Sequence, residues 1–155
     1  MPGLAANQQY NEQPDSSGQK GIWLSDTVKP EFPSSIKNLN RPSNKPYLLF
    51  IKDNQEVDDE TRNKTAEQMR DSLNQKKETG LTLSEYLIFQ RDYTQRNKQH
   101  PEDKYITWLL DSELASSLVL GAFWLSDGRQ VGVVSYVSGP HSDRGCRSSA
   151  VLPIF

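Results

Sequence analysis

The sequence predicts an α+β domain in which two helices pack on a twisted antiparallel sheet of about four or five strands. Two capping boxes, Thr65–Gln68 and Thr82–Glu85, each begin an amphipathic segment and predict the two helices. Short runs of branched and aromatic residues, separated by glycine and proline, predict strands on either side of them. The last third of the chain, from Tyr105 to Phe155, is therefore expected to form a compact antiparallel β unit.

The part of the core that precedes this β unit consists of one strand and the two helices. The apolar run 47–51 is short and lies between turn-forming residues, which favours a buried strand over a helix. The first helix is expected from 65 to about 77, with Gly80 as its C-terminal stop. The second helix is expected from 82 to near Asn97, because apolar residues recur there at helical spacing.

The pattern after Pro101 is typical of strands and tight turns. Four strands are expected, at 105–110, 119–126, 130–138 and 146–155. The dipeptide Asp127-Gly128 predicts a hairpin turn between the second and third of them. A loop or short helical turn is expected between the first two strands, and a polar loop before the last.

Three segments are predicted along the chain. Residues 1–20 are rich in Gln, Asn, Ser and Gly and are expected to be disordered. Residues 21–46 form a proline-rich arm, and residues 47–155 form a single α+β ligand-binding domain. Trp23 in the arm is interpreted as an anchor on the core, and the alternative is that it belongs to a peptide that binds a partner.

Charge and hydropathy exclude several classes of function. The 18 basic and 20 acidic side chains give a net charge of −2. The chain therefore lacks the excess of positive charge that binds nucleic acid or anionic membrane surfaces. The N-terminus lacks a signal peptide pattern, and no apolar run is long enough to span a bilayer. We therefore expect no membrane insertion and a cytoplasmic location by default, with a phage particle or signal-free secretion as alternatives.

The residues that could carry catalysis form no recognisable site, so the chain is not expected to be an enzyme. His141, Asp143 and Cys146 are so close in sequence that they are poorly placed to converge as base, orienting group and nucleophile. One cysteine permits no internal disulfide, and the histidines have no partners at metal-ligand spacing. Phosphate-binding loops are also missing, so no cofactor is expected.

The β unit instead has the composition of a recognition surface. Trp124 and Tyr136 are interleaved with serines and with charged residues, and aromatic anchors beside small polar residues are typical of adaptable binding surfaces. The alternative is that Trp124 and Tyr136 belong to the core and that their polar neighbours are ordinary loop residues.

The order of these motifs resembles a known family. The helix pattern L-T-L-S-E-Y-L-I-F-Q is followed by Y-I-T-W-L-L-D-S, by the hairpin S-D-G-R-Q-V-G-V and by the C-terminal segment R-G-C-R-S-S-A-V-L-P-I-F. Over residues 81–155 this order resembles the C-terminal half of the C-type-lectin-like fold. That fold occurs in formylglycine-generating-enzyme-like modules and in bacterial and phage proteins diversified by retroelements.

The resemblance implies a binding surface on the late strands and their connecting loop. The matching positions are Trp124, Ser126, Arg129, Tyr136, Ser138, His141, Ser142, Asp143 and Arg144. The chain departs from relatives that bind sugar through calcium, because it lacks their Glu-Pro-Asn type motif and their disulfide cysteines. It also lacks the paired cysteines of the oxidising enzymes.

Together these observations predict a ligand- or protein-binding domain with a variable recognition surface, as in a diversified receptor or adhesin of bacterial or phage origin. Its partner would be a protein or a surface ligand. Two alternatives remain open. One is a small intracellular interaction or structural protein that acts through the arm around Trp23, and the other is an unrecognised hydrolase.

Overall fold

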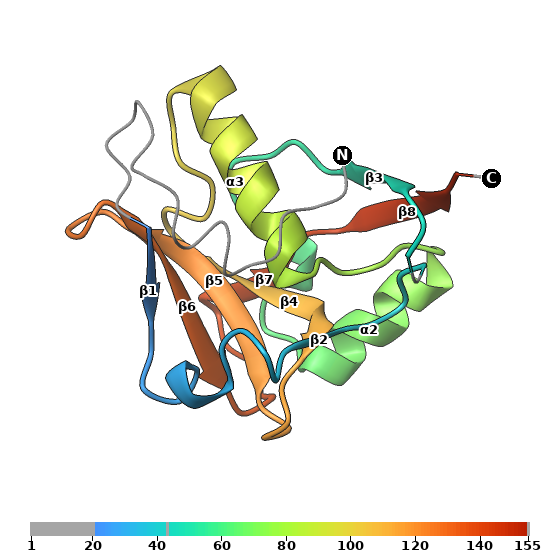
Figure 1. The fold of residues 1–155 in the computed structure, drawn as a ribbon, viewed down its shortest axis with the longest axis horizontal. Coiled ribbons are helices and arrows are strands. Elements are labelled where there is room, and N and C mark those ends of the chain that lie inside the picture. The colour runs from blue at the N-terminus through green and yellow to red at the C-terminus, as the bar shows by residue number, and fades with distance from the viewer. Residues whose placement is uncertain (1–20, 43, 155) are drawn as a thin grey trace.

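A computed structural model describes residues 21–42 and 44–154, which build one curled mixed sheet, two helices and a separate two-stranded ribbon (Figure 1). The sheet has six strands in the order β1-β6-β5-β4-β2, with β7 paired to β4. These strands are β1 (Ile22–Leu24), β2 (Lys37–Asn38), β4 (Ile106–Glu113), β5 (Val119–Leu125), β6 (Gln130–Tyr136) and β7 (Arg144–Cys146). The α+β class and the two helices are thus confirmed.

The sheet is not purely antiparallel, which corrects the prediction. β1 runs parallel to β6, and β7 runs parallel to β4. The hairpin of β5 and β6 is antiparallel as expected, although Arg129 and not Gly128 adopts the left-handed backbone conformation in its turn, with φ 51°. β4 continues to Glu113, where a loop or helical turn was expected.

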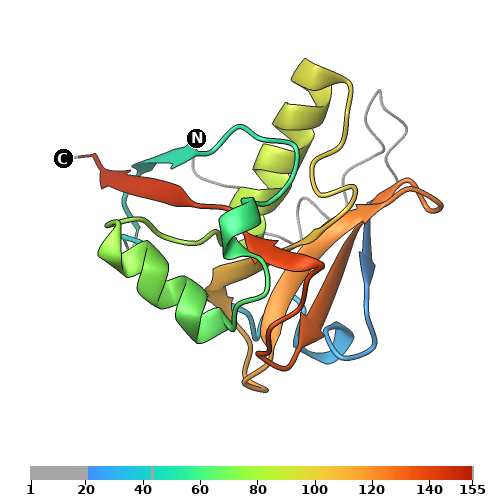
Figure 2. The ribbon, with the colours of Figure 1, turned by 180° about the vertical axis from the view of Figure 1, so that it is seen from behind.

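The two helices, α2 (Ala66–Gln75) and α3 (Leu83–Asn97), cover opposite faces of the sheet (Figure 2). Alternate residues of β4 point to the two sides, so Leu109 packs in the cluster that contains α3, whereas Trp108 and Leu110 pack in the cluster that contains α2. Short 3₁₀ turns, η1 (Lys29–Glu31) and η2 (Asp59–Thr61), complete the regular structure of the described residues.

Both helices begin at the predicted capping boxes. The Thr65 hydroxyl accepts a hydrogen bond from the Gln68 backbone N–H at 3.1 Å, and the Gln68 side chain accepts one from the Thr65 N–H at 2.9 Å. Thr82 and Glu85 form the same reciprocal pair at the start of α3. These local bonds satisfy N–H groups that have no partner within the helix, which is why a short sequence signal locates the helix start.

Thr65→Ala is expected to destabilise the protein by about 1 kcal/mol, because α2 loses the side-chain acceptor at its N-cap. Urea unfolding of the variant measures the loss. Thr65→Ser, which keeps the hydroxyl, is the matched control and should retain most of the stability. Equal losses in both variants would show that the methyl group of Thr65, and not its hydroxyl, stabilises the helix.

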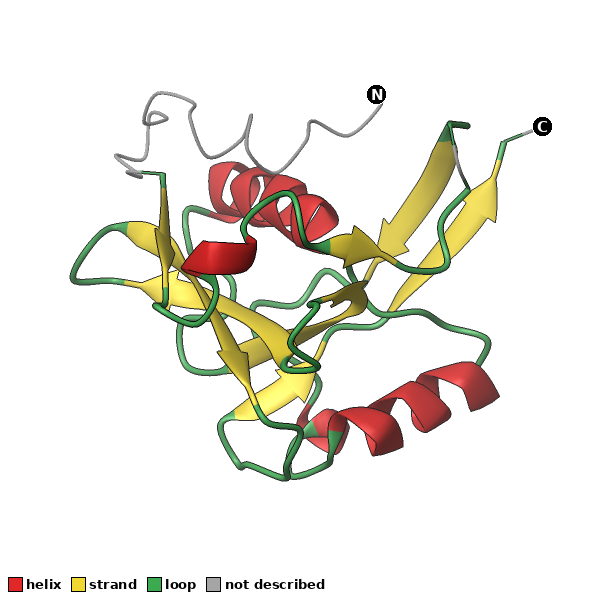
Figure 3. Cartoon of the chain, turned by 60° about the horizontal axis from the view of Figure 1, so that its bottom comes forward, coloured by secondary structure: helices red, strands yellow, loops and turns green. Residues whose placement is uncertain are grey.

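The predicted final strand is divided between two sheets. Its first residues belong to β7, whereas β8 (Ser149–Pro153) leaves the main sheet and pairs antiparallel with β3 (Tyr47–Ile51). The ribbon of β3 and β8 stands apart from the main sheet (Figure 3). The expected single β unit from Tyr105 to Phe155 therefore ends at β7, because the last strand finds its partner far away in the sequence.

The proline-rich arm is part of the same fold. β1 extends the main sheet at β6, β2 pairs with β4, and the arm buries Ile22 and Val28 in the core. Trp23 is 42% exposed, so the arm is held by its neighbours and by backbone pairing more than by the tryptophan. The predicted disorder of residues 1–20 lies outside the described residues.

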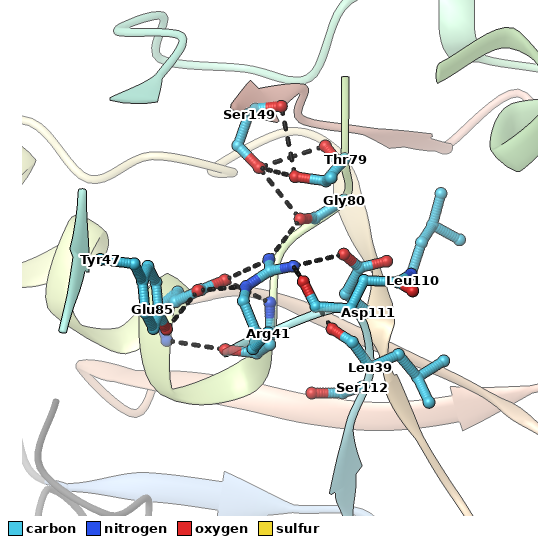
Figure 4. Close-up of polar contacts among 12 residues, drawn as sticks. Leu39, Arg41, Tyr47, Thr79, Gly80, Glu85, Leu110, Asp111, Ser112 and Ser149 are labelled. Atoms are coloured by element: carbon cyan, nitrogen blue, oxygen red, sulfur yellow. Dashed lines mark hydrogen bonds and ion pairs between the residues drawn. The ribbon is translucent and has the colours of Figure 1, made fainter. Parts of the chain in front are cut away.

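Arg41 joins this arm to the rest of the protein (Figure 4). Its guanidinium donates to both carboxylate oxygens of Glu85 at 2.7 Å, to Asp111 at 2.7 Å and to the Gly80 carbonyl at 2.9 Å. The Tyr47 hydroxyl donates to Glu85 at 2.8 Å. The arm, β3, α3 and β4 are thus connected through one buried cation.

Candidate functional site

The loop between β6 and β7, residues 137–143, is held against the segment that leads into α2. The Asn63 backbone N–H donates to the His141 carbonyl at 3.0 Å, and the Arg62 guanidinium donates to the Ser142 carbonyl at 3.0 Å. At the other end of the loop, the Ser138 hydroxyl accepts from the Ala66 N–H at 3.0 Å and donates to Glu67 at 2.6 Å. The loop is therefore held at both ends, through backbone carbonyls at His141 and Ser142 and through the hydroxyl of Ser138, which positions its side chains.

Two arginines lie over tyrosine rings beside this loop. The guanidinium carbon of Arg144 is 3.6 Å from the centroid of the Tyr136 ring, and that of Arg62 is 4.4 Å from the centroid of Tyr105. Such contacts favour one orientation of each ring, because the aromatic face attracts the cation. Arg62 and Tyr105 were not among the predicted site residues, since nothing in their local sequence shows that they meet this loop.

The nine predicted site residues fall into two groups at opposite ends of the β5–β6 hairpin. Six of them lie at the β6–β7 end, namely Tyr136, Ser138, His141, Ser142, Asp143 and Arg144. Trp124, Ser126 and Arg129 lie at the other end, about 20 Å away along strands that rise ~3.3 Å per residue. A single compact surface cannot include both groups.

Burial separates the predicted residues further. Trp124 is 9% exposed, and its ring stacks on that of His100 at 3.4 Å between centroids, which favours the alternative that Trp124 is core. Arg144 is also buried, beneath the surface and against Tyr136. His141, Ser142 and Asp143 are exposed, whereas Tyr136 and Ser138 are half-buried. The candidate site is therefore the surface of the β6–β7 loop with Tyr136 and Ser138 at its border.

Cys146 lies on β7, which follows this loop, and is fully buried against α2 and β4. Burial raises the pKa of its thiol to about 12, since the charged thiolate would lose its hydration there. The thiol is thus kept protonated near neutral pH, and Cys146 is a poor candidate for a nucleophile in the alternative hydrolase.

The expected result is that native Cys146 reacts with Ellman's reagent at pH 8 at least about a hundredfold more slowly than it does in urea. The physical reason is that both access and ionisation of the thiol require local opening of the fold. The release of the coloured thiolate measures both rates. Fast labelling of the native protein would contradict the burial of Cys146 and would restore it as a candidate nucleophile.

The motif Gly145–Arg147, on which the family resemblance partly rests, is structural. A Cβ atom at Gly145 would lie 2.6 Å from the Thr61 hydroxyl and 2.8 Å from a Val57 methyl group, so a side chain does not fit there. The Arg147 guanidinium forms a buried ion pair with Glu102 and donates to the Lys52 carbonyl at 2.7 Å. The motif therefore connects β7 to the segment before η2.

Burial raises the pKa of Glu102 to about 7, although Arg147 and the hydroxyl of Tyr86 oppose the shift. Because the folded pKa lies above the ordinary value of 4.5, Glu102 stabilises the fold fully below about pH 4.5, and this contribution is lost as the pH rises towards 7. The free energy of unfolding of the wild-type protein should therefore fall by about 2 kcal/mol between pH 5 and pH 8, relative to that of Glu102→Gln, whose side chain does not titrate. Urea unfolding of both proteins at the two pH values measures the difference, and a constant difference would contradict the raised pKa.

No metal site is formed within residues 21–42 and 44–154, where no group of three His, Cys, Asp or Glu side chains is placed to hold an ion. A hollow of about 380 Å³ lies away from the β6–β7 loop and is bordered by β3, β8 and the end of α2. It is lined by charged side chains of both signs and by Phe50. The candidate site itself is an exposed loop surface with aromatic, hydroxyl, imidazole and carboxylate groups, which suits hydrogen bonding to a ligand.

Comparison with known protein families, with curated proteins and with solved structures finds no match to this chain. Among the described residues no helix is long and apolar enough to cross a membrane. The geometry defines an α+β domain with a fixed exposed loop.

Proposed function

We propose that the chain is a binding domain of the C-type-lectin-like class, and that it recognises a protein or a surface ligand through the β6–β7 loop. The observation that carries this proposal is the division of roles within the loop. Its backbone carbonyls at His141 and Ser142 are bonded to the scaffold, whereas the side chains of both residues are exposed. A fixed backbone with free side chains loses little conformational freedom when a ligand binds.

The same division of roles supports a diversified receptor or adhesin of bacterial or phage origin. The side chains of His141, Ser142 and Asp143 are exposed, so exchanging them alters the surface with little effect on packing. The bonds that hold the loop at His141 and Ser142 use backbone carbonyl groups, which every residue type provides, whereas the bonds at its other end depend on the hydroxyl of Ser138. The order of elements, with two helices followed by the late strands and the Gly145–Arg147 motif, supports the C-type-lectin-like class.

Photo-crosslinking tests this proposal. Benzoylphenylalanine at Ser142 should capture a partner from the surface-protein fraction of bacterial cells, and the same group at the exposed Asp26 is the matched control. The captured protein is then purified and titrated against the variants. His141→Ala and Asp143→Ala should each weaken binding about tenfold. Equal capture from both positions, or unchanged affinity of the loop variants, would refute recognition through this loop.

Trp23 allows a test of the second candidate function, an interaction protein that acts through the arm. Its exposed ring lies on β1, the edge strand of the main sheet, where a partner could contact it. Because β1 is part of the sheet, Trp23→Ala is a cleaner test than deletion of the arm. Loss of binding in this variant, with normal binding in the loop variants, would favour an interaction protein that acts through the arm.

A further inference from the structure

The outer face of the β3–β8 ribbon is apolar and exposed. Leu48, Phe50, Leu152 and Ile154 are 50%, 56%, 51% and 44% exposed, respectively. Leu48 lies opposite Leu152 in the register of the two strands, so these side chains form one continuous patch. An exposed patch of large apolar side chains on a ribbon that stands apart from the sheet is typical of an interaction surface (Figure 3).

The same ribbon has an open edge at β3. Lys52 donates its backbone N–H to Ser148, and Ile154 donates to Pro46, both at 3.4 Å. Because the hydrogen-bonding direction alternates along an antiparallel strand, the even-numbered residues of β3 face β8. The N–H and C=O groups of Tyr47, Leu49 and Ile51 therefore point away from β8, and none of these residues bonds to a backbone outside the ribbon in the described part of the chain.

No charged residue or proline interrupts the strand from Tyr47 to Ile51, so the edge lacks the usual protection against pairing with another strand. Pro153 lies on β8, at the opposite edge of the ribbon, and an isolated bridge between Thr79 and Ser149 occupies part of that edge. The two edges thus differ, and β3 is the one that is open to a partner strand.

We propose that a second copy of this chain pairs with β3, in an antiparallel dimer whose two-fold axis passes through Leu49. This register places Tyr47 opposite Ile51 of the second copy, and Leu49 opposite its own counterpart. Each of these pairs exchanges both of its N–H···O hydrogen bonds, so all the outward backbone groups of β3 gain partners. The contact is isologous, as two-fold symmetry requires.

The side chains of the strand are complementary in the same register. Leu48 lies beside Phe50 of the second copy in the more closely spaced kind of cross-strand pair, which covers both apolar groups. Just beyond the strand, Lys45 lies opposite Asp53 of the second copy, and two-fold symmetry repeats this pair of opposite charges. Lys45 forms no ion pair with a described residue. Asp53 accepts hydrogen bonds from Arg96 at both carboxylate oxygens, and its side chain remains 55% exposed.

This complementarity favours a second copy over the chain's own first residues as the occupant of the patch. Apart from Met1, the segment 1–20 contains only Leu4 and Tyr10 as large apolar side chains. That composition does not match a patch of four large apolar groups.

Sedimentation velocity of the full chain over a range of concentrations tests the dimer. Lys45→Asp and Asp53→Lys should each weaken it about tenfold, because like charges then lie opposite each other at two symmetric positions. The double variant Lys45→Asp/Asp53→Lys should restore dimerisation to near the wild-type level. Asp26→Lys, which makes the same change of charge at an exposed position in the arm, is the control and should leave the dimer intact.

Amide hydrogen exchange gives a second readout at single residues. The N–H groups of Tyr47, Leu49 and Ile51 should become protected as the concentration of the chain rises, whereas those of Leu48 and Phe50 should be protected at all concentrations by β8. Phe50→Glu should abolish the dimer while the thermal melt shifts by no more than a few degrees, since the side chain is exposed.

Three results would overturn the proposal. The first is a chain that stays monomeric at all concentrations. The second is a dimer that survives Phe50→Glu. The third is a dimer that Phe50→Glu abolishes but that neither Lys45→Asp nor Asp53→Lys alone weakens, which would indicate two ribbons stacked face to face without edge pairing. A partner of another kind at the β6–β7 loop would leave all of these measurements unchanged, so the two proposals are tested separately.

Discussion

Arg147→Ala is expected to destabilise the fold by about 3–5 kcal/mol, because it leaves the buried carboxyl of Glu102 without its cation. Both side chains are almost completely inaccessible, at 1% and 0% exposure. The guanidinium also donates to the carbonyls of Lys52 and Gln55, and it lies 4.5 Å from the centre of the Phe89 ring. Its removal therefore deprives β7, α3 and the segment before η2 of a shared contact.

Urea unfolding followed by circular dichroism measures this loss. The double variant Arg147→Met/Glu102→Leu is the informative companion, because it replaces the ion pair by apolar side chains and leaves no buried charge. It should recover a large part of the stability that the single variant loses. If the double variant is as unstable as Arg147→Ala, the hydrogen bonds to the carbonyls, and not the uncompensated carboxyl, account for the effect.

Arg41→Ala should destabilise the protein by about 3 kcal/mol, because it leaves the buried carboxylates of Glu85 and Asp111 without the guanidinium that bonds to both of them. The side chains of Glu85 and Asp111 are 6% and 8% exposed. Burial alone would raise the pKa of Glu85, but hydrogen bonds from Arg41, the Thr82 backbone and Tyr47 together lower it. Loss of Arg41 therefore removes the main group that keeps this carboxyl ionised.

Because Arg41 lies in the arm, its loss should also loosen the fold locally, in addition to lowering the overall stability. Amide hydrogen exchange should accelerate first in the arm next to β2 and at the start of α3, because the guanidinium joins the arm to Glu85. Arg96→Ala is the matched control: Arg96 also contacts both oxygens of a carboxylate, that of Asp53, but it is 46% exposed. Its loss should change stability by less than about 1 kcal/mol. Equal effects of the two variants would show that burial of the Arg41 cluster does not matter.

The proposed dimer bears on the proposed recognition function. The β3 edge and the β6–β7 loop belong to different parts of the fold, so pairing at β3 leaves the loop free in both copies. Two loops in one dimer bind a repetitive surface more strongly than one, because the second contact forms at a high effective concentration. A surface ligand present in many copies is the kind of partner that would gain from this arrangement.

The sequence by itself determined the elements whose signals are local. Both helices begin at their capping boxes, because Thr65 and Thr82 bond to residues only three positions away. The strand at 47–51 and the hairpin of β5 and β6 were predictable for the same reason, since apolar runs and turn residues act over a few positions. The expected burial of the 47–51 strand was wrong, because it lies in a two-stranded ribbon and exposes Leu48 and Phe50 on one face. The α+β class followed from the order of these elements.

Only the tertiary structure decided which strands pair and which polar groups are buried together. The sequence of β8 is compatible with the main sheet, and its pairing with β3 depends on contacts across about a hundred residues. Arg41 and Arg147 look like surface residues in the sequence, whereas Glu85, Asp111 and Glu102 meet them in the core. Trp124 was predicted to lie on the surface because serines and charged residues surround it in the sequence. It lies instead in the core, with its ring stacked on that of His100.

The candidate site shows the same limit. Its loop and its exposed residues, His141, Ser142 and Asp143, were predictable because a polar segment between two strands lies at the surface. Its contact with Arg62, which also lies over the Tyr105 ring, was not, because both residues come from other parts of the chain. Local hydrogen bonds and the periodicity of apolar residues depend on residues that are close in the sequence. Strand pairing, side-chain burial and charge compensation depend on distant residues that only the folded chain brings together.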